Sequence, residues 1–131
     1  MRWLNRSPRK EIWDEPIEAS IGDLGAAQRI REICRSAADS AETVGAAADR
    51  AHKKLVRDVE RYERAAKTAM EIAMQISDEL LRDAAVRQIV DLCLKAGNVP
   101  TARTLFRAIQ SKSIRDEVSR DHPTLASQRS G

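Results

Sequence analysis

Apolar and small residues recur at alternating steps of four and three along a stretch of the chain that contains no proline. The first series consists of Ile30, Cys34, Ala37, Ala41, Val44, Ala48, Ala51 and Leu55. A second series, shifted by about one residue, consists of Val59, Tyr62, Ala66, Ala69, Ala73 and Ile76. Such spacing gathers the apolar side chains on one face of an α-helix. It predicts an Ala-rich heptad segment over residues 24–76 whose apolar seam is buried against another helix.

The composition supports an all-α fold of antiparallel helical hairpins packed into a bundle. Only 3% of the 131 residues are aromatic, which disfavours β-sheets and favours closely packed helices. A chain of this length forms one domain, which we place at residues 20–121. Acidic residues also stand four positions before basic ones, the favourable order along a helix: Glu60/Arg64, Glu63/Lys67, Asp78/Arg82, Asp83/Arg87 and Asp91/Lys95.

Gly45 leaves two arrangements open for residues 24–76. Glycine is a poor helix former, so Gly45 is a candidate turn between two helices that fold back on each other. The seam nevertheless continues without interruption across this position, as it would in one long helix. The hairpin suits a compact monomer, whereas the long helix suits a homodimer joined through the heptad seam.

Capping residues divide the C-terminal half into shorter helices. Residues 77–78 end one helix and cap the next, and residues 96–98 (Ala-Gly-Asn) provide a C-terminal stop before Pro100. Ser113 and Asp116 have the spacing of a capping box at the start of a last helix. We expect that helix to end at His122-Pro123 and residues 122–131 to form a disordered tail.

The chain also matches itself at an offset of 33 residues. Residues 69–76 align with residues 102–109, and residues 81–83 align with residues 114–116. The identities are Ala69/Ala102, Ile76/Ile109, Arg82/Arg115 and Asp83/Asp116. A period of about 33–34 residues is typical of helical repeat arrays.

Residues 94–102, Leu-Lys-Ala-Gly-Asn-Val-Pro-Thr-Ala, resemble the turn between the two helices of a tetratricopeptide (TPR) repeat. In this resemblance Ala102 matches the small residue of the second helix and Phe106 its large packing residue, whereas Val90 stands where the first helix usually has a small one. The resemblance covers about residues 66–118 and implies helix-turn-helix repeats in the C-terminal half. Since arrays need about three repeats for stability, residues 24–62 would serve as the missing neighbour.

Residues 1–19 form a charge-segregated N-terminal arm. The first ten residues carry four basic side chains and no acidic one, whereas residues 11–19 carry only acidic charges. Pro8 and Pro16 limit any helix here to a short turn. Trp3 and Trp13 could dock into a partner protein, contact an anionic membrane surface, stack on single-stranded nucleic acid, or simply cover one end of the bundle.

No catalytic or metal-binding constellation is recognisable in the sequence. His52 lies among cations and His122 has a single acidic neighbour, while Cys34 and Cys93 stand alone on apolar faces. Glycine-rich phosphate loops and nucleophile elbows are missing. We therefore expect a protein that is not an enzyme, with no cofactor and no metal.

These observations predict a protein–protein interaction module, a small helical adaptor or scaffold. The candidate protein-binding residues are Trp3, Trp13, Arg103, Phe106 and Arg107. The alternative is association with nucleic acid through the basic arm and the C-terminal arginines, with Arg2, Arg6, Arg9, Lys10 and Arg115 as candidates. The net charge of +3 is too small to require such a partner. Without a signal peptide or an apolar run of about 18 residues, we expect a cytoplasmic protein with no transmembrane segment.

Overall fold

The computed structural model describes residues 11–15, 21–46 and 53–126. It contains a short 3₁₀ helix and six α-helices, and these described residues include no β-strand. The elements are η1 (Ile12–Asp14), α1 (Gly22–Ala46), α2 (Lys53–Ala73), α3 (Glu79–Lys95), α4 (Val99–Ala108), α5 (Lys112–Asp121) and α6 (Pro123–Ala126). The prediction of an all-α helical bundle is confirmed.

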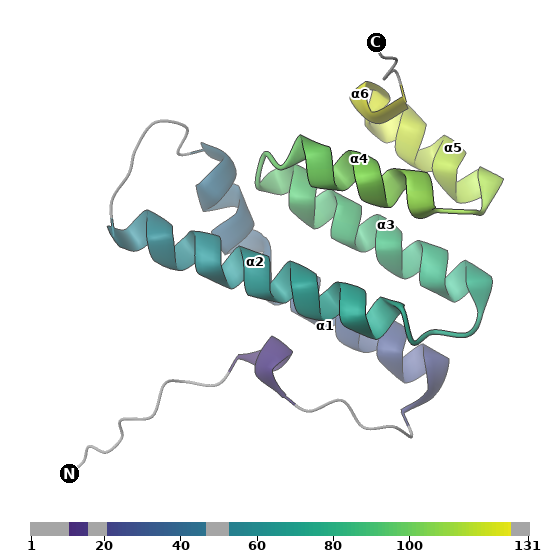
Figure 1. Cartoon of the computed structure of the whole chain (residues 1–131), viewed down its shortest axis with the longest axis horizontal. Coiled ribbons are helices and arrows are strands. Elements are labelled where there is room, and N and C mark those ends of the chain that lie inside the picture. The colour runs from purple at the N-terminus through teal and green to yellow at the C-terminus, as the bar shows by residue number, and fades with distance from the viewer. Residues whose placement is uncertain (1–10, 16–20, 47–52, 127–131) are drawn as a thin grey trace.

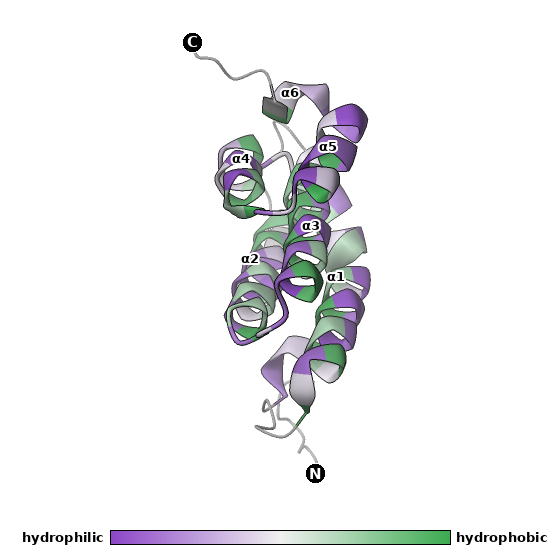
Figure 2. Ribbon diagram, turned by 90° about the vertical axis from the view of Figure 1, so that its right-hand side faces the viewer, coloured by the Kyte–Doolittle hydropathy of each residue, from purple (hydrophilic) through white to green (hydrophobic). Residues whose placement is uncertain are grey.

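The helices are arranged in two layers with α3 at the centre. Helix α3 packs against α1, α2, α4 and α5 (Figure 1). Seen from the side, α2 and α4 lie along one face and α1, α3 and α5 along the other, with apolar surfaces turned inward (Figure 2). The largest fully buried side chains come from α1, α2, α3, α5 and α6 and from the loops that follow α2 and α4. They include Ile30, Ile33, Ile72, Ile76, Ile89, Leu92 and Ile109.

Residues 24–76 form a hairpin rather than one long helix, since α1 ends at Ala46 and α2 begins at Lys53. The seam residues Ile30, Ala37 and Ala41 are fully buried within the chain. Gly45 is not the turn but lies inside α1, where the helix passes very close to the end of α3. A Cβ atom at Gly45 would collide with the backbone carbonyl oxygen of Lys95. Its lack of a side chain therefore permits this close approach.

The turn between α3 and α4 follows the sequence prediction closely. Gly97 has a φ of 75°, and its amide donates to the Leu94 carbonyl (3.0 Å). The Asn98 amide donates to the Cys93 carbonyl (2.8 Å), which completes a Schellman motif. Asn98 also caps α4 by accepting from the Thr101 amide, and its side-chain amide donates to the Tyr62 hydroxyl (2.9 Å). This last bond ties the turn to α2.

Two interhelix loops, 33 residues apart, are built with the same contacts. We call residues 74–78 the α2–α3 junction and residues 109–111 the α4–α5 junction. In the first, the Asp23 carboxylate accepts from the Ser77 and Asp78 amides (3.0 and 2.8 Å). In the second, Asp83 accepts from the Gln110 and Ser111 amides (3.1 and 2.7 Å).

Arginines reinforce both junctions from the helix that follows. Arg82 donates to the Ile76 carbonyl (3.4 Å), and Arg115 donates to the Ile109 carbonyl (2.9 Å). Ile76 and Ile109 are both buried. Ile76 and Arg82 thus make the same contact as Ile109 and Arg115, their matches at an offset of 33.

Some predicted boundaries differ from those observed. Ser111, not Ser113, caps α5, because its side chain accepts from the Ile114 amide. The helical part also extends beyond residue 121. Pro123–Ala126 form α6, and Leu125 is buried because this turn packs over α4 and α5. Residues 127–131 lie outside the described part.

None of the five acid–base pairs predicted along a helix forms an ion pair within the described residues, and side chains of three of them take side-chain partners outside their own helix. Arg64 pairs with Asp14, and Arg87 pairs with Glu117 and, at 3.2 Å, with Asp121. Asp91 contacts the His122 Nε2 atom at 3.3 Å rather than Lys95. The bundle brings these distant charges within reach, so contacts between helices replace contacts along one helix.

Candidate functional site

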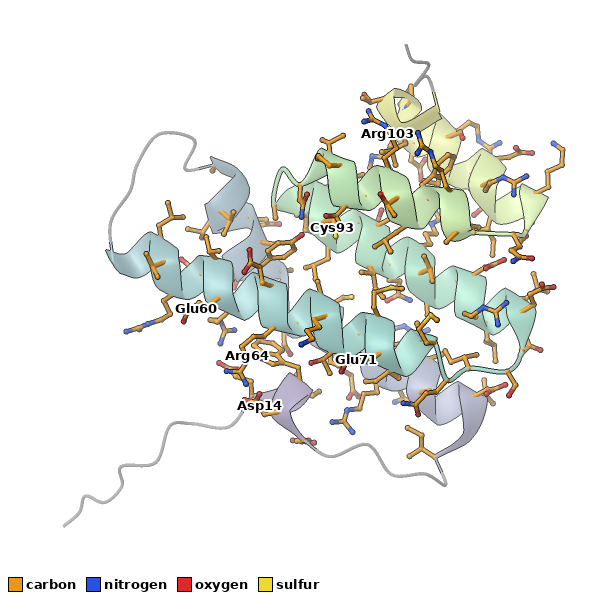
Figure 3. The ribbon with its side chains drawn as sticks, in the orientation of Figure 1. Asp14, Glu60, Arg64, Glu71, Cys93 and Arg103 are labelled. Atoms are coloured by element: carbon orange, nitrogen blue, oxygen red, sulfur yellow. The ribbon has the colours of Figure 1, made fainter. Side chains whose placement is uncertain are left out.

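Trp13, a predicted protein-binding anchor, is buried in the core, which fits the open alternative that it covers part of the bundle. It is 4% exposed, and the Arg61 guanidinium lies 5.0 Å from its ring centroid. The acidic residues beside it bind α2: Glu11 pairs with Arg61, and Asp14 pairs with Arg64, as Figure 3 shows for the second pair. The residues of η1 therefore cover the α1–α2 hairpin, and Trp13 is not free to contact a partner.

Arg61 also joins a polar network between α1 and α2. Its Nε atom donates to the Ser40 hydroxyl (2.9 Å), which donates to the Asp58 carboxylate (3.0 Å). Ser40 is buried, and these bonds satisfy its hydroxyl inside the interface. The network holds the hairpin that η1 covers.

The predicted protein-binding residues of α4 divide into a buried and an exposed group. Phe106, a predicted docking residue, is buried with Ala102 and Ile109, because the apolar face of α4 packs on α3. Arg103 is half-buried on the side of α4 that faces α6 (Figure 3), and its Nε atom is buried without a hydrogen-bond partner. Arg107 is exposed. Trp3, the remaining candidate, lies outside the described residues.

The alternative nucleic-acid surface is represented only by Arg115. Its guanidinium donates to the Ile109 and Gln110 carbonyls (2.9 and 3.4 Å), so it supports the α4–α5 junction. The other four candidates, Arg2, Arg6, Arg9 and Lys10, lie outside the described part of the chain.

Both cysteines are held as neutral thiols. Burial, with smaller contributions from Cys93 and Asp91, raises the pKa of Cys34 to about 12. Burial also raises the pKa of the Cys93 thiol and of the Tyr62 hydroxyl. Because the thiolate is the reactive form of cysteine, neither side chain is poised as a nucleophile at neutral pH. Within the described ranges no three His, Cys, Asp or Glu side chains are grouped so that they could hold a metal ion.

One end of the bundle exposes large apolar side chains that the sequence analysis did not single out. Leu24, Met74 and Leu80 are 74%, 72% and 61% exposed. Leu24 lies at the start of α1, Met74 just after α2, and Leu80 at the start of α3. The two hydrogen bonds from the Ser77 and Asp78 amides to Asp23 hold these three segments together. We call these three residues the end patch. The sequence carries no separate signal for them, because buried residues such as Ile33 and Ile72 also lie outside both heptad series.

The end patch is an unusual feature of a surface that is otherwise rich in charge. Several exposed apolar side chains gathered at one end of a bundle are more typical of a binding surface than single ones, which are common everywhere. Val56 is the other large apolar side chain with high exposure among the described residues, at 59%, and it lies near the opposite end of α2. It therefore provides an internal comparison for the end patch.

No protein-family model, curated protein or solved structure matches this chain. In the part that the structure describes, no helix is both long and apolar enough to cross a membrane.

Proposed function

We propose that this chain is a non-catalytic protein-interaction module, a small helical adaptor that binds an apolar segment of a partner protein at its end patch. The observation that carries the proposal is the grouping of Leu24, Met74 and Leu80 at one end of the bundle. Burial of one such side chain contributes about 1.5–3 kcal/mol, so a few of them supply the centre of an interface.

The layered stacking of helices supports the further proposal of a TPR-like repeat. Alternate helices lie in two layers, and two junctions share the same Asp and Arg contacts at an offset of 33 residues (Figure 2). Arrays of this kind present extended surfaces to partner proteins. The end patch lies at the α2–α3 junction, where one helix pair meets the next.

Site-specific photo-crosslinking in cells of the source organism can identify the partner. A crosslinking amino acid at Leu80 is expected to capture one main protein, whereas the same group at Val56, which is similarly exposed, captures it poorly. The partner is then purified and its affinity measured. Met74→Ser combined with Leu80→Ser should weaken binding about tenfold or more, since roughly 1.4 kcal/mol corresponds to tenfold. Val56→Ser should change the affinity less than twofold.

The outcomes separate the possible partners. Equal capture at Leu80 and Val56, or unchanged affinity of the double variant, would contradict the proposal. Crosslinks between two copies of the chain would replace the adaptor with a homodimeric scaffold. Binding to single- or double-stranded nucleic acid that falls steeply with salt would favour the alternative function, because each neutralised phosphate releases counterions.

A further inference from the structure

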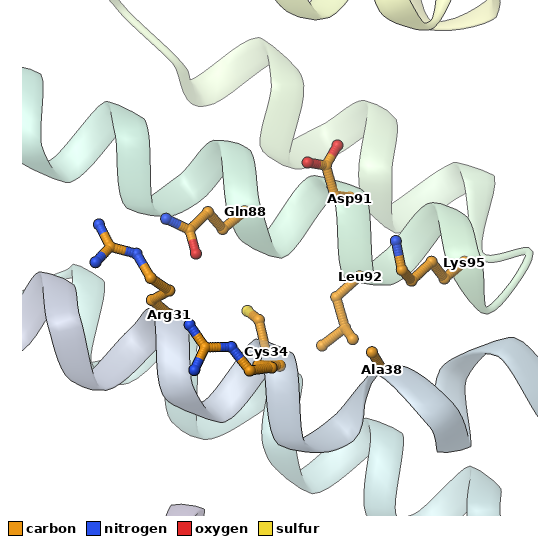
Figure 4. Close-up of a pocket in the computed structure, with 8 residues that line it drawn as sticks. Arg31, Cys34, Ala38, Gln88, Asp91, Leu92 and Lys95 are labelled. Carbon is orange, nitrogen blue, oxygen red and sulfur yellow. The ribbon is translucent and has the colours of Figure 1, made fainter.

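A second surface feature is a pocket between α1 and α3, away from the end patch. Its volume is about 230 Å³. Figure 4 shows Cys34 pointing from α1 toward α3, with Arg31 on the same helix and Gln88 and Leu92 on the opposite one. Pockets for drug-sized ligands span about 300–1,000 Å³, so this one has room for a smaller molecule.

Three cations surround the pocket without partners of their own. Arg31 and Arg35 lie one turn apart on α1, and Lys95 lies near the end of α3. All three are exposed, and within the described chain none of them forms a hydrogen bond or an ion pair. Other arginines of the bundle, such as Arg64 and Arg87, are paired with carboxylates. The lining of the pocket, with three cations and one acidic residue, therefore carries an excess of positive charge.

Asp91 is the one acidic residue of the lining, and it sets one negative charge against the three cations. The Asp91 carboxylate contacts the Nε2 atom of His122 at 3.3 Å. Gln88 adds an amide group to the lining, and no described residue forms a hydrogen bond with it. Polar donors that converge on one concave site are typical of sites that orient a small ligand.

The floor of the pocket is neutral and partly apolar. It is formed by Leu92, which is buried, with Ala38 and Cys34 from α1. The raised pKa of Cys34 keeps its thiol uncharged, so it packs as a small apolar group. A ligand here would find positive charge at the rim and apolar surface beneath it.

We propose that this pocket binds a small organic anion, whose carboxylate or phosphate group is bound by Arg31, Arg35 and Lys95 and whose short apolar part lies on Leu92, Ala38 and Cys34. Guanidinium groups match the geometry of both anions by paired hydrogen bonds. The site is independent of the end patch, and neither proposal depends on the other.

The test is a titration of the full chain followed by two-dimensional NMR of backbone amides and arginine side chains. The probes are phenyl phosphate, phenylacetate, inorganic phosphate and benzyl alcohol. Binding of phenyl phosphate or phenylacetate is expected to shift signals of Arg31, Arg35, Gln88 and Lys95, and the tighter of the two identifies the preferred anion. Benzyl alcohol, which has no charge, should not bind.

Substitutions in the pocket test separately where the anionic group and the apolar part of the probe bind. Arg35→Gln and Lys95→Gln change exposed side chains and should each weaken the preferred probe about tenfold, because each removes a charge-assisted hydrogen bond to the anion. Arg57→Gln, an exposed arginine of α2, is the matched control and should change affinity less than twofold. Ala38→Leu should weaken the phenyl compounds but leave inorganic phosphate unchanged.

Two results would overturn the proposal. One is that neither phenyl compound binds the unmodified chain more tightly than it binds the Arg35→Gln/Lys95→Gln double variant. The other is that the shifted signals lie outside the α1–α3 pocket. Unchanged NMR spectra of the variants in the absence of probe confirm that the fold is retained, so lost binding reports on the pocket itself.

Discussion

The α2–α3 and α4–α5 junctions use the same contacts in different surroundings. In each, one aspartate from the first turns of a helix accepts two consecutive backbone amides of a later loop. Asp83 is 1% exposed, whereas Asp23 is partly exposed to solvent. Water can replace a lost hydrogen-bond partner only at a site that solvent can reach. The same two hydrogen bonds should therefore stabilise the α4–α5 junction more than the α2–α3 junction.

The hydrogen-bond geometry differs as well. Both amides at the α4–α5 junction donate to one oxygen, Oδ2 of Asp83. At the α2–α3 junction the Ser77 amide donates to Oδ1 of Asp23 and the Asp78 amide to Oδ2. An asparagine, which keeps one carbonyl oxygen, can therefore replace Asp83 more completely than it can replace Asp23.

The largest expected effect is that of Asp83→Ala. This change leaves the Gln110 and Ser111 amides without their acceptor in a buried site, which we expect to lower the free energy of unfolding by about 3 kcal/mol. Urea titration followed by circular dichroism measures the change. Asp83→Asn should lower the free energy of unfolding by less than half as much as Asp83→Ala does. A loss below about 1 kcal/mol for Asp83→Ala would show that burial does not distinguish the junctions.

Asp23→Ala should have a smaller effect, about 1 kcal/mol, because water can hydrate the Ser77 and Asp78 amides. The same titration applies. Asp23→Asn should destabilise the chain nearly as much as Asp23→Ala, since its one carbonyl oxygen can accept from only one of the Ser77 and Asp78 amides. If the alanine variants at Asp23 and Asp83 were equally destabilised, the comparison would fail.

The supporting arginines should rank as the two aspartates do: Arg115 at the α4–α5 junction should contribute more to stability than Arg82 at the α2–α3 junction. Arg115 donates to two carbonyls, at 2.9 and 3.4 Å, whereas Arg82 reaches one carbonyl at 3.4 Å and Glu79 at 3.8 Å. We expect Arg115→Gln to cost about 1 kcal/mol and Arg82→Gln a few tenths. Hydrogen exchange of the amides in residues 74–78 and 109–111 would show which junction opens first. Arg115→Gln should accelerate exchange at residues 109–111 more than Arg82→Gln accelerates it at residues 74–78, and the reverse would contradict this order.

The smallest effect is expected at Asp116, which matches Asp83 at the offset of 33. Asp116 is exposed and bonds to Lys112 (3.0 Å) rather than to a loop. Exposed ion pairs contribute little, so Asp116→Ala should change stability by less than about 0.5 kcal/mol. Thermal unfolding of this variant beside Asp83→Ala measures the difference. A large loss would mean that Asp116 holds a contact equivalent to that of Asp83.

Much of the fold was predictable because local signals carry it. The heptad series located the faces of α1 and α2 that are buried, and the Gly97-Asn98 turn was predicted from residues adjacent in the chain. The hairpin of residues 24–76 was one of two open arrangements. Gly45 was misplaced as a turn because its role depends on Lys95, fifty residues away in the chain, and not on its neighbours.

The candidate sites were less predictable. Trp13 was chosen because large aromatic side chains anchor interfaces, but they also fill cores, and the sequence does not separate these uses. Phe106, which was matched to a packing residue, is also buried. The end patch consists of residues from three segments that the hydrogen bonds of Asp23 hold together, so it cannot be recognised in the sequence of any one of them. The α1–α3 pocket likewise requires two helices that are distant in the sequence.

The sequence alone determined the helical character, the approximate helix limits and the 33-residue self-match, because periodicity and capping are local properties of the chain. The tertiary structure decided which charges pair and which apolar residues remain outside. Asp83 shows the difference. Its spacing suits a surface pair with Arg87, yet the bundle buries it against the amides of Gln110 and Ser111. A buried carboxylate must be satisfied by whatever donors packing brings to it, and packing is a property of the whole chain.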